Sequence, residues 1–345
     1  MLSALTALVL YVAARNPVSL SGWLYAGALL AACVALLVNP WVRYRRWVRR
    51  LGLGALMSLV LIGAGRCTMV GSSWRGGMSM QTWPDGDDAR LLDRIIDERD
   101  LAFLGLEVLP YTGMIFEQEA RGARAAFAKV YGELAERHGN VASPFAATWL
   151  GLQRAAAYDV VLFSSKPRAS RAVVLLHGST GNYVFECFLM ARALASLGVL
   201  TVCPSTGVEG AWWKGDGPAI LDSTLQQLAR RGVKRVVLAG LSNGGIGASL
   251  LASRVAGARR GRARVVGLLL LFGLTPRAPR TWLPTLVLHA SGDARMSARA
   301  ARGYVARAKN ARLVTLRGDH FAMAKRPRAV GRVVRAFVKR LLGGR

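Results

Sequence analysis

The sequence predicts an α/β protein: a mostly parallel, doubly wound sheet preceded by transmembrane helices and a small helical region. From about residue 156 onward, short apolar runs alternate with helical stretches of 12–16 residues, the order found in parallel sheets with right-handed crossovers. Near the N-terminus, Leu20–Val38 holds 19 consecutive uncharged residues, enough to cross a bilayer. We therefore expect a membrane anchor over 1–66, a helical linker or lid over 67–155 and an α/β domain over 156–345.

Two shorter apolar stretches flank the long one. Met1–Ala14 and Leu51–Gly65 hold 14 and 15 residues, slightly fewer than a transmembrane helix needs. A cleaved signal peptide would explain only the first stretch, which lacks a basic start and a small-residue cleavage site. The anchor is therefore expected to contain two to three transmembrane helices.

The orientation of the anchor depends on an arginine-rich loop. Residues 41–50 carry five arginines together with aromatic residues, which is typical of a cytoplasmic loop. If residues 51–65 cross the membrane, the rest of the chain lies outside the cytoplasm; if they lie in the interface, it is cytoplasmic. A snorkelling Arg66 and the apolar Met69 and Val70 favour crossing. We expect a multi-pass protein of a bacterial inner membrane, with its large domain facing the periplasm.

The segment over 67–155 shows helical patterns. Apolar residues recur at helical spacing over 91–96, and a second helix is expected from about Phe116 to His138, ending at Gly139. Ser143 and Pro144 are typical of the start of a third helix. The segment is either a lid over one edge of the sheet or a spacer packed on its back.

The domain over 156–345 contains the alternating pattern. Six strands are expected from continuous apolar runs, at 172–176, 199–203, 236–239, 265–272, 285–289 and 312–316. Helices are expected between and after them, near 183–197, 218–231, 295–308 and 327–342.

The most informative motif lies where the third of these strands ends. Residues 240–244 are Gly-Leu-Ser-Asn-Gly, between an apolar run and the small-residue stretch 245–252. A serine flanked in this way at a strand-to-helix turn is presented as a nucleophile, because the tight turn leaves no room for side chains two positions away. An ordinary glycine turn is the alternative. The strand before the motif and the helical stretch after it favour Ser242 as a nucleophile.

An acid and a histidine follow later, each after a strand. Asp293 follows the strand at 285–289, and His320 lies in the loop after the last strand. The carboxyl ends of parallel strands share one edge of a sheet, so we expect the three side chains to meet there. Two alternatives remain: Asp293 caps a helix that begins near Ala294, or Asp319 is the acid in place of Asp293.

The other three histidines are weaker candidates. His138 lies near a helix end, His177 follows the first strand of the domain, and His289 lies within an apolar strand.

These motifs resemble the α/β-hydrolase superfamily over roughly 156–345. The resemblance rests on the His177-Gly loop after one strand, the Gly-x-Ser-x-Gly motif two strands later, and an acid and a histidine in that order. It is similar to compact carboxylesterases and dienelactone-hydrolase-like members, and residues 272–284 are too few for a large cap domain. The resemblance implies a triad of Ser242, His320 and Asp293, with backbone N–H groups of Ser179 and Asn243 forming the oxyanion hole.

Four further residues are candidates for a substrate pocket. They are His177 and Thr180 in the loop after the first strand of the domain, and Trp212 and Trp213 near the edge of the sheet. Tryptophans in such a place line an acyl or aromatic pocket or pack locally.

Composition narrows the classes of partner and cofactor. The net charge is +28, but the arginines are spread over helices and no nucleic-acid module is present, so no nucleic acid is expected. Basic clusters at 254–264 and 325–340 would suit an anionic membrane surface; arginine-rich usage without a binding role is the alternative. The four cysteines lack metal-ligand spacing, so no metal or other cofactor is expected. Cys187 and Cys203 look buried and do not fix the redox compartment.

The sequence therefore predicts a membrane-anchored serine hydrolase that cleaves a carboxylic ester through an acyl-enzyme. Its expected partners are a small-molecule acyl ester and the lipid bilayer. A thioesterase or serine peptidase of the same fold is the nearest alternative, and a non-catalytic membrane-bound scaffold is the alternative from another class.

Overall fold

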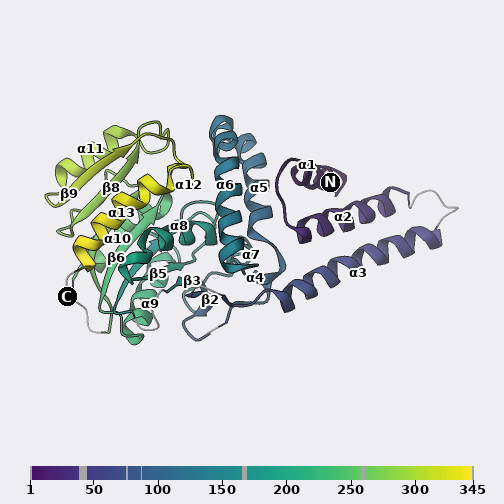
Figure 1. Ribbon diagram of the computed structural model, residues 1–345, viewed down its shortest axis with the longest axis horizontal. Coiled ribbons are helices and arrows are strands. Elements are labelled where there is room, and N and C mark those ends of the chain that lie inside the picture. The colour runs from purple at the N-terminus through teal and green to yellow at the C-terminus, as the bar shows by residue number, and fades with distance from the viewer. Residues whose placement is uncertain are drawn as a thin grey trace.

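The computed structural model describes residues 2–38, 45–74, 77–86, 88–164, 169–257 and 261–343. Two parts are plain in Figure 1: a rounded α/β body, and helices at the N-terminal end that project from one side of it. The fold class predicted from the sequence is confirmed.

The body is built on one mixed sheet with the strand order β1-β2-β3-β5-β4-β6-β7-β8-β9. Strands β4 to β9 are mutually parallel, and β3 runs antiparallel to its neighbours β2 and β5. The strands are β1 (Ser73–Trp74), β2 (Met78–Trp83), β3 (Tyr158–Phe163), β4 (Arg171–Leu176), β5 (Leu200–Pro204), β6 (Arg235–Leu241), β7 (Arg264–Leu271), β8 (Thr285–Ala290) and β9 (Ala311–Leu316).

Helices cover both faces of the sheet, which explains why its central strands are apolar on both sides. One face packs against α8 (Val184–Leu194) and α13 (Pro327–Leu342), and the other against α9 (Gly217–Arg230), α10 (Asn243–Val255) and α11 (Ala298–Arg307). Along β4, Val173 and Leu175 point into the first layer, and Val174 and Leu176 into the second.

The six strands predicted from apolar runs are all present, as β4 to β9, and the four predicted helices lie within three residues of α8 with its extension η4 (Ala195–Leu197), α9, α11 and α13. The prediction missed β1, β2 and β3. Two of these lie in the segment expected to be helical, and β2 extends the sheet by pairing with β3 along its whole length. A six-residue strand at this place is defined by its partner, which local periodicity does not reveal.

The rest of the segment 67–155 is helical. It contains α4 (Leu92–Ile95), α5 (Glu98–Val108), η3 (Leu109–Thr112), α6 (Glu117–His138) and α7 (Phe145–Trp149). Helices α5 and α6 form a layer between the body and the N-terminal helices, and run across the direction of the latter (Figure 1). Phe127, Val130 and Leu134 of α6 are buried at helical spacing, so α6 joins the main core.

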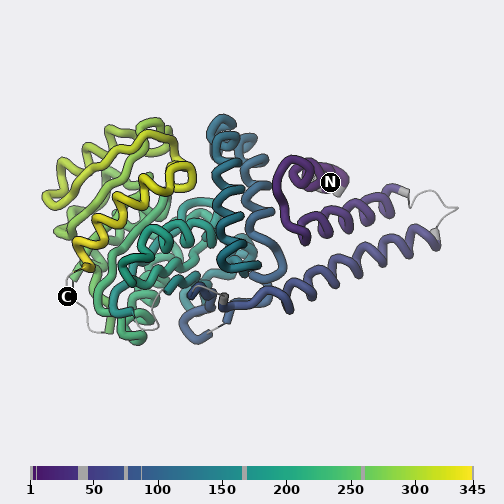
Figure 2. The backbone as a smooth tube through the Cα atoms, in the orientation of Figure 1, coloured from purple at the N-terminus to yellow at the C-terminus, as the bar shows by residue number. Residues whose placement is uncertain are grey.

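Three helices precede this layer: α1 (Leu2–Arg15), α2 (Leu20–Val38) and α3 (Arg45–Met69). Figure 2 shows α2 and α3 as an antiparallel hairpin that points away from the body. Both are long and apolar enough to cross a membrane, whereas α1 is shorter. The arginine-rich loop expected at 41–50 is partly helical, because α3 begins at Arg45; Trp41, Arg43 and Tyr44 lie outside the described residues.

Polar contacts fix the hairpin to the body. Ser19, just before α2, donates hydrogen bonds to Asp100 of α5 from its backbone N–H (2.6 Å) and its hydroxyl (2.5 Å). Arg66 of α3 donates to the Ser21 hydroxyl at 2.9 Å and lies 3.8 Å from Asp97. Arg66 is buried in this junction, so the expectation that it snorkels along lipid is wrong: carboxylate and hydroxyl groups of the chain solvate it.

The basic clusters expected to meet a membrane surface lie elsewhere. Arg254 ends α10 and residues 325–340 belong mostly to α13, and Figure 1 places both helices in the part of the body remote from the hairpin. Residues 258–260 lie outside the described chain.

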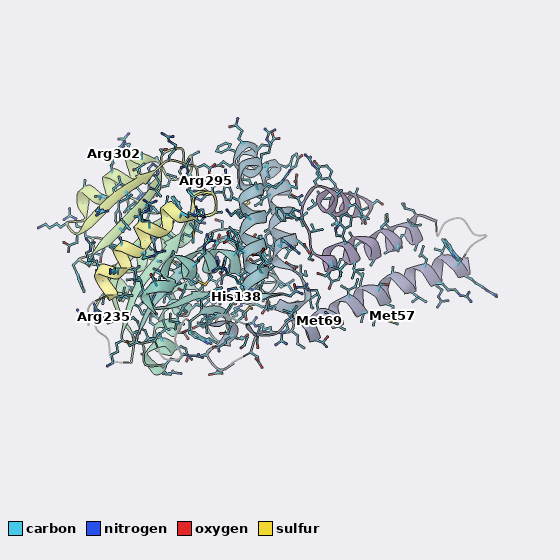
Figure 3. All side chains as sticks on the ribbon, viewed as in Figure 1. Met57, Met69, His138, Arg235, Arg295 and Arg302 are labelled. Atoms are coloured by element: carbon cyan, nitrogen blue, oxygen red, sulfur yellow. A yellow bond between two sulfur atoms is a disulfide. The ribbon has the colours of Figure 1, made fainter. Side chains whose placement is uncertain are left out.

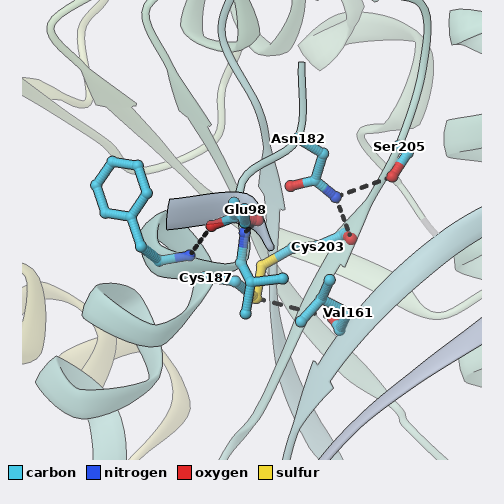
Figure 4. Close-up of a disulfide and its surroundings, with 8 residues drawn as sticks. Glu98, Val161, Asn182, Cys187, Cys203 and Ser205 are labelled. Carbon is cyan, nitrogen blue, oxygen red and sulfur yellow. Dashed lines mark hydrogen bonds between the residues drawn. A yellow bond between two sulfur atoms is a disulfide. The ribbon is translucent and has the colours of Figure 1, made fainter. Parts of the chain in front are cut away.

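A disulfide joins two elements of the body. Cys187 of α8 is bonded to Cys203 of β5, with a Cα–Cα separation of 6.0 Å (Figure 4). Both cysteines are buried, as the sequence predicts, but it gave no sign that they pair. The bridge cross-links a helix of one layer to the central sheet.

Candidate active site

The turn that holds Ser242 is as tight as the sequence motif predicts. Ser242 joins β6 to α10 with φ 52° and ψ −120°, a conformation that non-glycine residues rarely adopt. A Cβ at Gly240 would lie 2.1 Å from the oxygen of Gly244, and one at Gly244 would lie 2.0 Å from the oxygen of Leu176. Only glycine fits at either position, so the local sequence permits the strained turn that presents the hydroxyl.

Two more loops close on this turn. A Cβ at Gly178, in the loop after β4, would lie 3.0 Å from the Cβ of Ser242. A Cβ at Gly273, after β7, would lie 1.9 Å from the backbone carbonyl oxygen of Ser242. The backbone therefore passes Ser242 at both places without an intervening side chain. These approaches hold the serine in a fixed position at the carboxyl edge of the sheet.

The three residues expected to meet at this edge form a hydrogen-bonded chain. His320 Nε2 lies 2.9 Å from Ser242 Oγ, and His320 Nδ1 lies 2.9 Å from Asp293 Oδ2. Ser242 follows β6, Asp293 follows β8 and His320 follows β9, so the parallel strands deliver all three to one rim. The arrangement lets the imidazole accept the serine proton while the carboxylate orients the ring.

Asp293 uses its two oxygens for different tasks. Oδ2 faces His320, while Oδ1 accepts hydrogen bonds from the backbone N–H groups of Arg295 (2.8 Å) and Met296 (3.0 Å). Burial favours a higher pKa for Asp293, but the hydrogen bonds from His320 and from the two N–H groups outweigh it and hold the pKa below its usual value. The carboxyl therefore caps the local turn and is ionised against the imidazole, whereas the helix expected near Ala294 begins at Ala298, where Ser297 is the cap.

The rival acid and two of the other histidines have different surroundings. Asp319 forms an ion pair with Lys325 at 2.6 Å and caps the N–H of Phe321, so it is engaged away from His320. His289 is buried in β8, and His138 packs edge-on against Phe163.

The N–H groups predicted to form an oxyanion hole belong to cavity-lining residues beside Ser242. Ser179 follows Gly178, whose backbone touches Ser242, and Asn243 is the first residue of α10. Neither N–H donates a hydrogen bond to another residue in the described part of the chain. Asn243 stands at a helix N-terminus, where exposed N–H groups and the helix dipole favour a negative charge.

A cavity of about 300 Å³ opens in front of Ser242 and His320. Its floor is the edge of the sheet, and part of its wall comes from the segment 67–155. The wall residues from that segment are mainly apolar and include Ala102, Leu106, Leu109, Ile115 and Phe127. The layer of α5 and α6 therefore covers the catalytic edge of the body, which favours the lid alternative over a spacer on the back of the sheet.

Of the four residues predicted to line a substrate pocket, Thr180 lines this cavity and the others do not. His177 is buried beneath the loop: its Nε2 accepts the N–H of Thr206, so Nδ1 carries the proton and donates to the oxygen of Gly178. Burial lowers the pKa of His177 to about 4, which keeps the ring neutral. Trp212 is fully buried and donates to the His177 oxygen at 3.0 Å. Trp213 lies at the surface, outside the cavity lining.

Packing explains why His177 and Trp212 do not line the cavity. His177 and Trp212 support the loop that carries Gly178 from below, and their hydrogen bonds to its backbone fix its course. They position the wall of the site without reaching into it.

Glu186 is a cavity residue that the sequence analysis missed. It lies in the first turn of α8, and its Oε2 is buried with no hydrogen-bond partner among the described residues. Burial, with a smaller contribution from the charge of Glu98, raises the pKa of Glu186 to about 8. The carboxyl is therefore mostly neutral at pH 7, and this part of the wall carries little charge. A single acid among the apolar residues at the start of α8 was the available signal.

Glu98 has the opposite surroundings. It accepts hydrogen bonds from the N–H groups of Val184 (2.6 Å) and Phe185 (3.1 Å) at the start of α8, the contacts drawn in Figure 4, and from the hydroxyls of Tyr131 and Ser143. Burial raises the pKa of Glu98 to about 7 against the effect of these donors. The carboxyl of α5 thus caps α8 and ties the covering layer to the body.

A second tie lies on the other side of the cavity. Arg295, in the loop after β8, donates to both carboxylate oxygens of Glu119 in α6 (3.0 and 2.9 Å) and to the oxygen of Met114 (2.8 Å). Figure 3 labels Arg295 near the α6 layer. Because Arg295 is two residues from Asp293, the covering layer is linked directly to the loop that carries the acid.

The described residues contain no group of three or more His, Cys, Asp or Glu side chains placed to hold a metal ion. The buried acids near the cavity, Glu98 and Glu119, take donors from the protein instead.

The sheet order and the strained serine turn identify the fold. This is the α/β-hydrolase fold. No protein-family model matches the chain, and no curated protein matches it. Solved structures do match, and several of them are esterases or other hydrolases that cover a little over half of this chain.

Three of these structures illustrate the likeness. Est1E from Butyrivibrio proteoclasticus is 15% identical with a TM-score of 0.44, over 55% of this chain and 96% of its own. The esterase Pf2001 from Pyrococcus furiosus is 14% identical with a TM-score of 0.46, over 54% and 88%. A predicted CIB-like hydrolase from Thermoplasma acidophilum is 17% identical with a TM-score of 0.40, over 53% and 94%.

Proposed function

We propose that this protein is a membrane-anchored serine hydrolase that cleaves a carboxylic ester through Ser242, His320 and Asp293. The observation that carries the proposal is the hydrogen-bonded chain from Asp293 through His320 to Ser242, with 2.9 Å at each step. The strained turn and the cavity in front of it supply the two other requirements, a presented nucleophile and room for an acyl group.

In the proposed reaction, His320 Nε2 takes the Ser242 proton as the oxygen attacks the ester carbonyl carbon. The carbonyl oxygen becomes an oxyanion facing the N–H groups of Ser179 and Asn243, and Asp293 stabilises the protonated imidazole. The tetrahedral intermediate then collapses: the ester C–O bond breaks, and His320 returns its proton to the departing alkoxide. Water repeats the sequence on the acyl-enzyme, which releases the acid and restores Ser242.

The cavity supports an ester with an apolar acyl group over a polypeptide. The cavity of about 300 Å³ beneath the α5 and α6 layer has a mainly apolar wall, which suits an apolar acyl group better than the polar backbone of a polypeptide. The complete hydrogen-bonded set counts against the non-catalytic scaffold, since a protein that has lost its chemistry has no need to keep a strained serine turn.

Membrane anchoring is the second part of the proposal, and the surface of the hairpin supports it. The apolar windows of α2 and α3 are only 22% and 11% buried, unlike the core helix of a soluble protein. The 19 residues of α2 span about 28 Å at 1.5 Å per residue, close to the hydrocarbon thickness of a bilayer. Trp23 lies in the first turn of α2 and Trp47 in the first turn of α3, so exposed tryptophans stand at opposite ends of the hairpin, as at two membrane interfaces.

The same hairpin supports an orientation of the protein in the membrane. Its arginine-rich end, with Arg46, Arg49 and Arg50, points away from the body (Figure 1), and the positive-inside tendency places that end in the cytoplasm. The body then lies on the other side of the membrane. The disulfide between Cys187 and Cys203 agrees with this side, because disulfides persist in oxidising compartments such as the periplasm.

A probe experiment tests the chemistry. A fluorophosphonate should label the full-length wild type and not Ser242→Ala, and Ser242→Ala should lose esterase activity by a factor of about 10⁴ to 10⁶. Ser291→Ala, an exposed serine at the same rim, is the control and should keep both. Activity that survives in Ser242→Ala overturns the proposal. A panel of p-nitrophenyl esters, acyl-CoAs and peptide amides then ranks ester against thioester and peptide.

The orientation has its own test. Phosphatase and fluorescent-protein reporters at the C-terminus should give an active phosphatase and a dark fluorescent protein. The reverse pattern places the body in the cytoplasm.

A further inference from the structure

The outer rim of the cavity is an exposed apolar segment between α5 and α6. Leu109, Met114 and Ile115 line the cavity, and Met114 is also 46% exposed, so it stands at the mouth. Tyr111 and Phe116 of the same segment are 90% and 59% exposed. The central strands of the body bury their apolar residues almost completely, whereas this segment presents several large ones at the opening of the site. Such a patch marks a surface that meets another apolar phase.

This rim adjoins the N-terminal helices. Asn16, at the end of α1, donates a hydrogen bond to Glu107 near the end of α5 at 3.3 Å. Arg15 is close enough to Glu107 and to Tyr111 to interact with both electrostatically. Val12 of α1 is buried in the same core cluster as Leu106. The mouth of the cavity therefore lies beside the point where the chain turns from α1 into the hairpin.

The geometry of the hairpin then determines how close the mouth of the cavity lies to the membrane surface. Helix α2 begins at Leu20, directly after the Ser19 contacts with Asp100 of α5. Because α5 and α6 run across the direction of α2 and α3 (Figures 1 and 2), a bilayer that surrounds the hairpin has its surface along the α5 side of the body. Tyr111 and Met114 lie at the end of that layer, where they can reach the headgroup region.

We propose that the protein draws its ester from the lipid bilayer, through a mouth formed by Leu109, Tyr111, Met114 and Phe116, so that its substrate is a membrane-resident ester with a long acyl chain. This inference rests on the proposed function, the hydrolase and its anchor, and adds the substrate class and its route.

The chemistry of the route fits such a chain. An acyl chain that passes from the bilayer into the cavity exchanges one apolar surrounding for another and does not cross water, where each CH₂ group costs about 0.8 kcal/mol. A polar, water-soluble ester has no such reason to approach from the membrane side. The wall beyond the mouth offers the apolar Leu106 and Phe127. Arg295 also lines the cavity, and its charge is paired with Glu119.

The test compares two substrates in one preparation. The full-length protein is reconstituted in phosphatidylcholine vesicles, and the rates are measured for p-nitrophenyl acetate in the water and for a long-chain p-nitrophenyl ester dissolved in the vesicles. In Tyr111→Asp/Phe116→Asp, two charges replace exposed aromatic residues that do not line the cavity, and they oppose the seating of the mouth in the membrane interface. We expect the ratio of long-chain to acetate rate to fall at least about tenfold, with the acetate rate nearly unchanged.

The matched control is Trp282→Asp, which adds a charge at an exposed apolar residue of the body outside the cavity lining, and it should leave the ratio as in the wild type. If the double variant loses the acetate rate as well, Tyr111→Gln, which is polar but uncharged, replaces it and should still lower the ratio. An unchanged ratio in a variant that keeps its acetate rate overturns the route. The proposed hydrolase chemistry fails in a different way, when Ser242→Ala retains the acetate rate.

Discussion

The body and the α2–α3 hairpin place their apolar residues in opposite ways. In the body, Val174, Val237 and Leu269 are 0% exposed in strands covered by helices on both faces. In the hairpin, Leu36 and Leu61 are 60% and 62% exposed. The same types of side chain are thus buried in a core in the body and exposed at the surface in the hairpin. Composition alone therefore does not identify a core, whereas exposure in the folded chain separates the two uses.

The boundary between the two regions is polar. Ser19 with Asp100, and Arg66 with Asp97, satisfy one another where the hairpin leaves the body. Paired ions and hydroxyls of this kind are costly in hydrocarbon. In the proposed anchoring, this junction lies where the lipid ends and the aqueous body begins.

The largest expected effect comes from charging the hairpin. In Leu56→Arg/Val60→Arg, two exposed residues one turn apart near the middle of α3 become cations, close to Met57 in Figure 3. Each arginine at the centre of a spanning helix costs about 2.5 to 3.5 kcal/mol on the insertion scale. We expect most of the protein to leave the carbonate-washed membrane fraction. Trp282→Arg, the same kind of change in the body, should leave that fraction unchanged. If the double variant stays fully in the membrane fraction, the exposed apolar residues of the hairpin do not anchor the protein, and the contrast drawn with the body fails.

A smaller effect is expected from the disulfide of the body. Cys187→Ser opens a link between residues 16 apart, and a loop of about 15 residues contributes about 3 kcal/mol in the chain-entropy description. Thermal unfolding of the detergent-purified protein should shift to lower temperature, and a reducing agent should shift the wild type alike. Cys67→Ser, at a free cysteine, is the control. If a reductant leaves the wild-type midpoint in place, the bond does not contribute to stability.

The smallest effect concerns Glu186, a titratable side chain that is buried among apolar residues of the body. Its pKa is raised to about 8 in the folded chain, above the ordinary value near 4.3 for an unfolded glutamate. The unfolded chain therefore gives up this proton first, and wild-type stability falls as the pH rises from about 4.3 to 8. Glu186→Gln has no proton to lose, so its stability relative to the wild type should increase by about 1 kcal/mol or more between pH 5 and pH 8.

The measurement is the difference in unfolding free energy between Glu186→Gln and the wild type at several pH values. Glu209→Gln, at an exposed ion pair with Lys214, is the comparison and should not show this rise. Parallel stability curves for Glu186→Gln and the wild type would show that this carboxyl is solvated in the folded protein.

The candidate site shows how far local patterns reach. Ser242, Asp293 and His320 were predictable because each follows a strand, and parallel strands bring their carboxyl ends to one edge. His177 and Trp212 lie near the same edge in sequence, yet they point beneath the loop and not into the cavity. A strand end locates a residue at the rim, but the direction of its side chain depends on neighbours from other segments.

Local sequence patterns predict the alternation of strands and helices, the tight serine turn and the apolar hairpin helices. Each depends on a few neighbouring residues, through the period of the apolar positions or through the missing Cβ at Gly240 and Gly244. The folded structure was needed to show that β2 extends the sheet, that Cys187 pairs with Cys203, and that α5 and α6 form part of the cavity wall. These features join residues far apart in the chain, and such pairings depend on how the layers pack, which local periodicity does not encode.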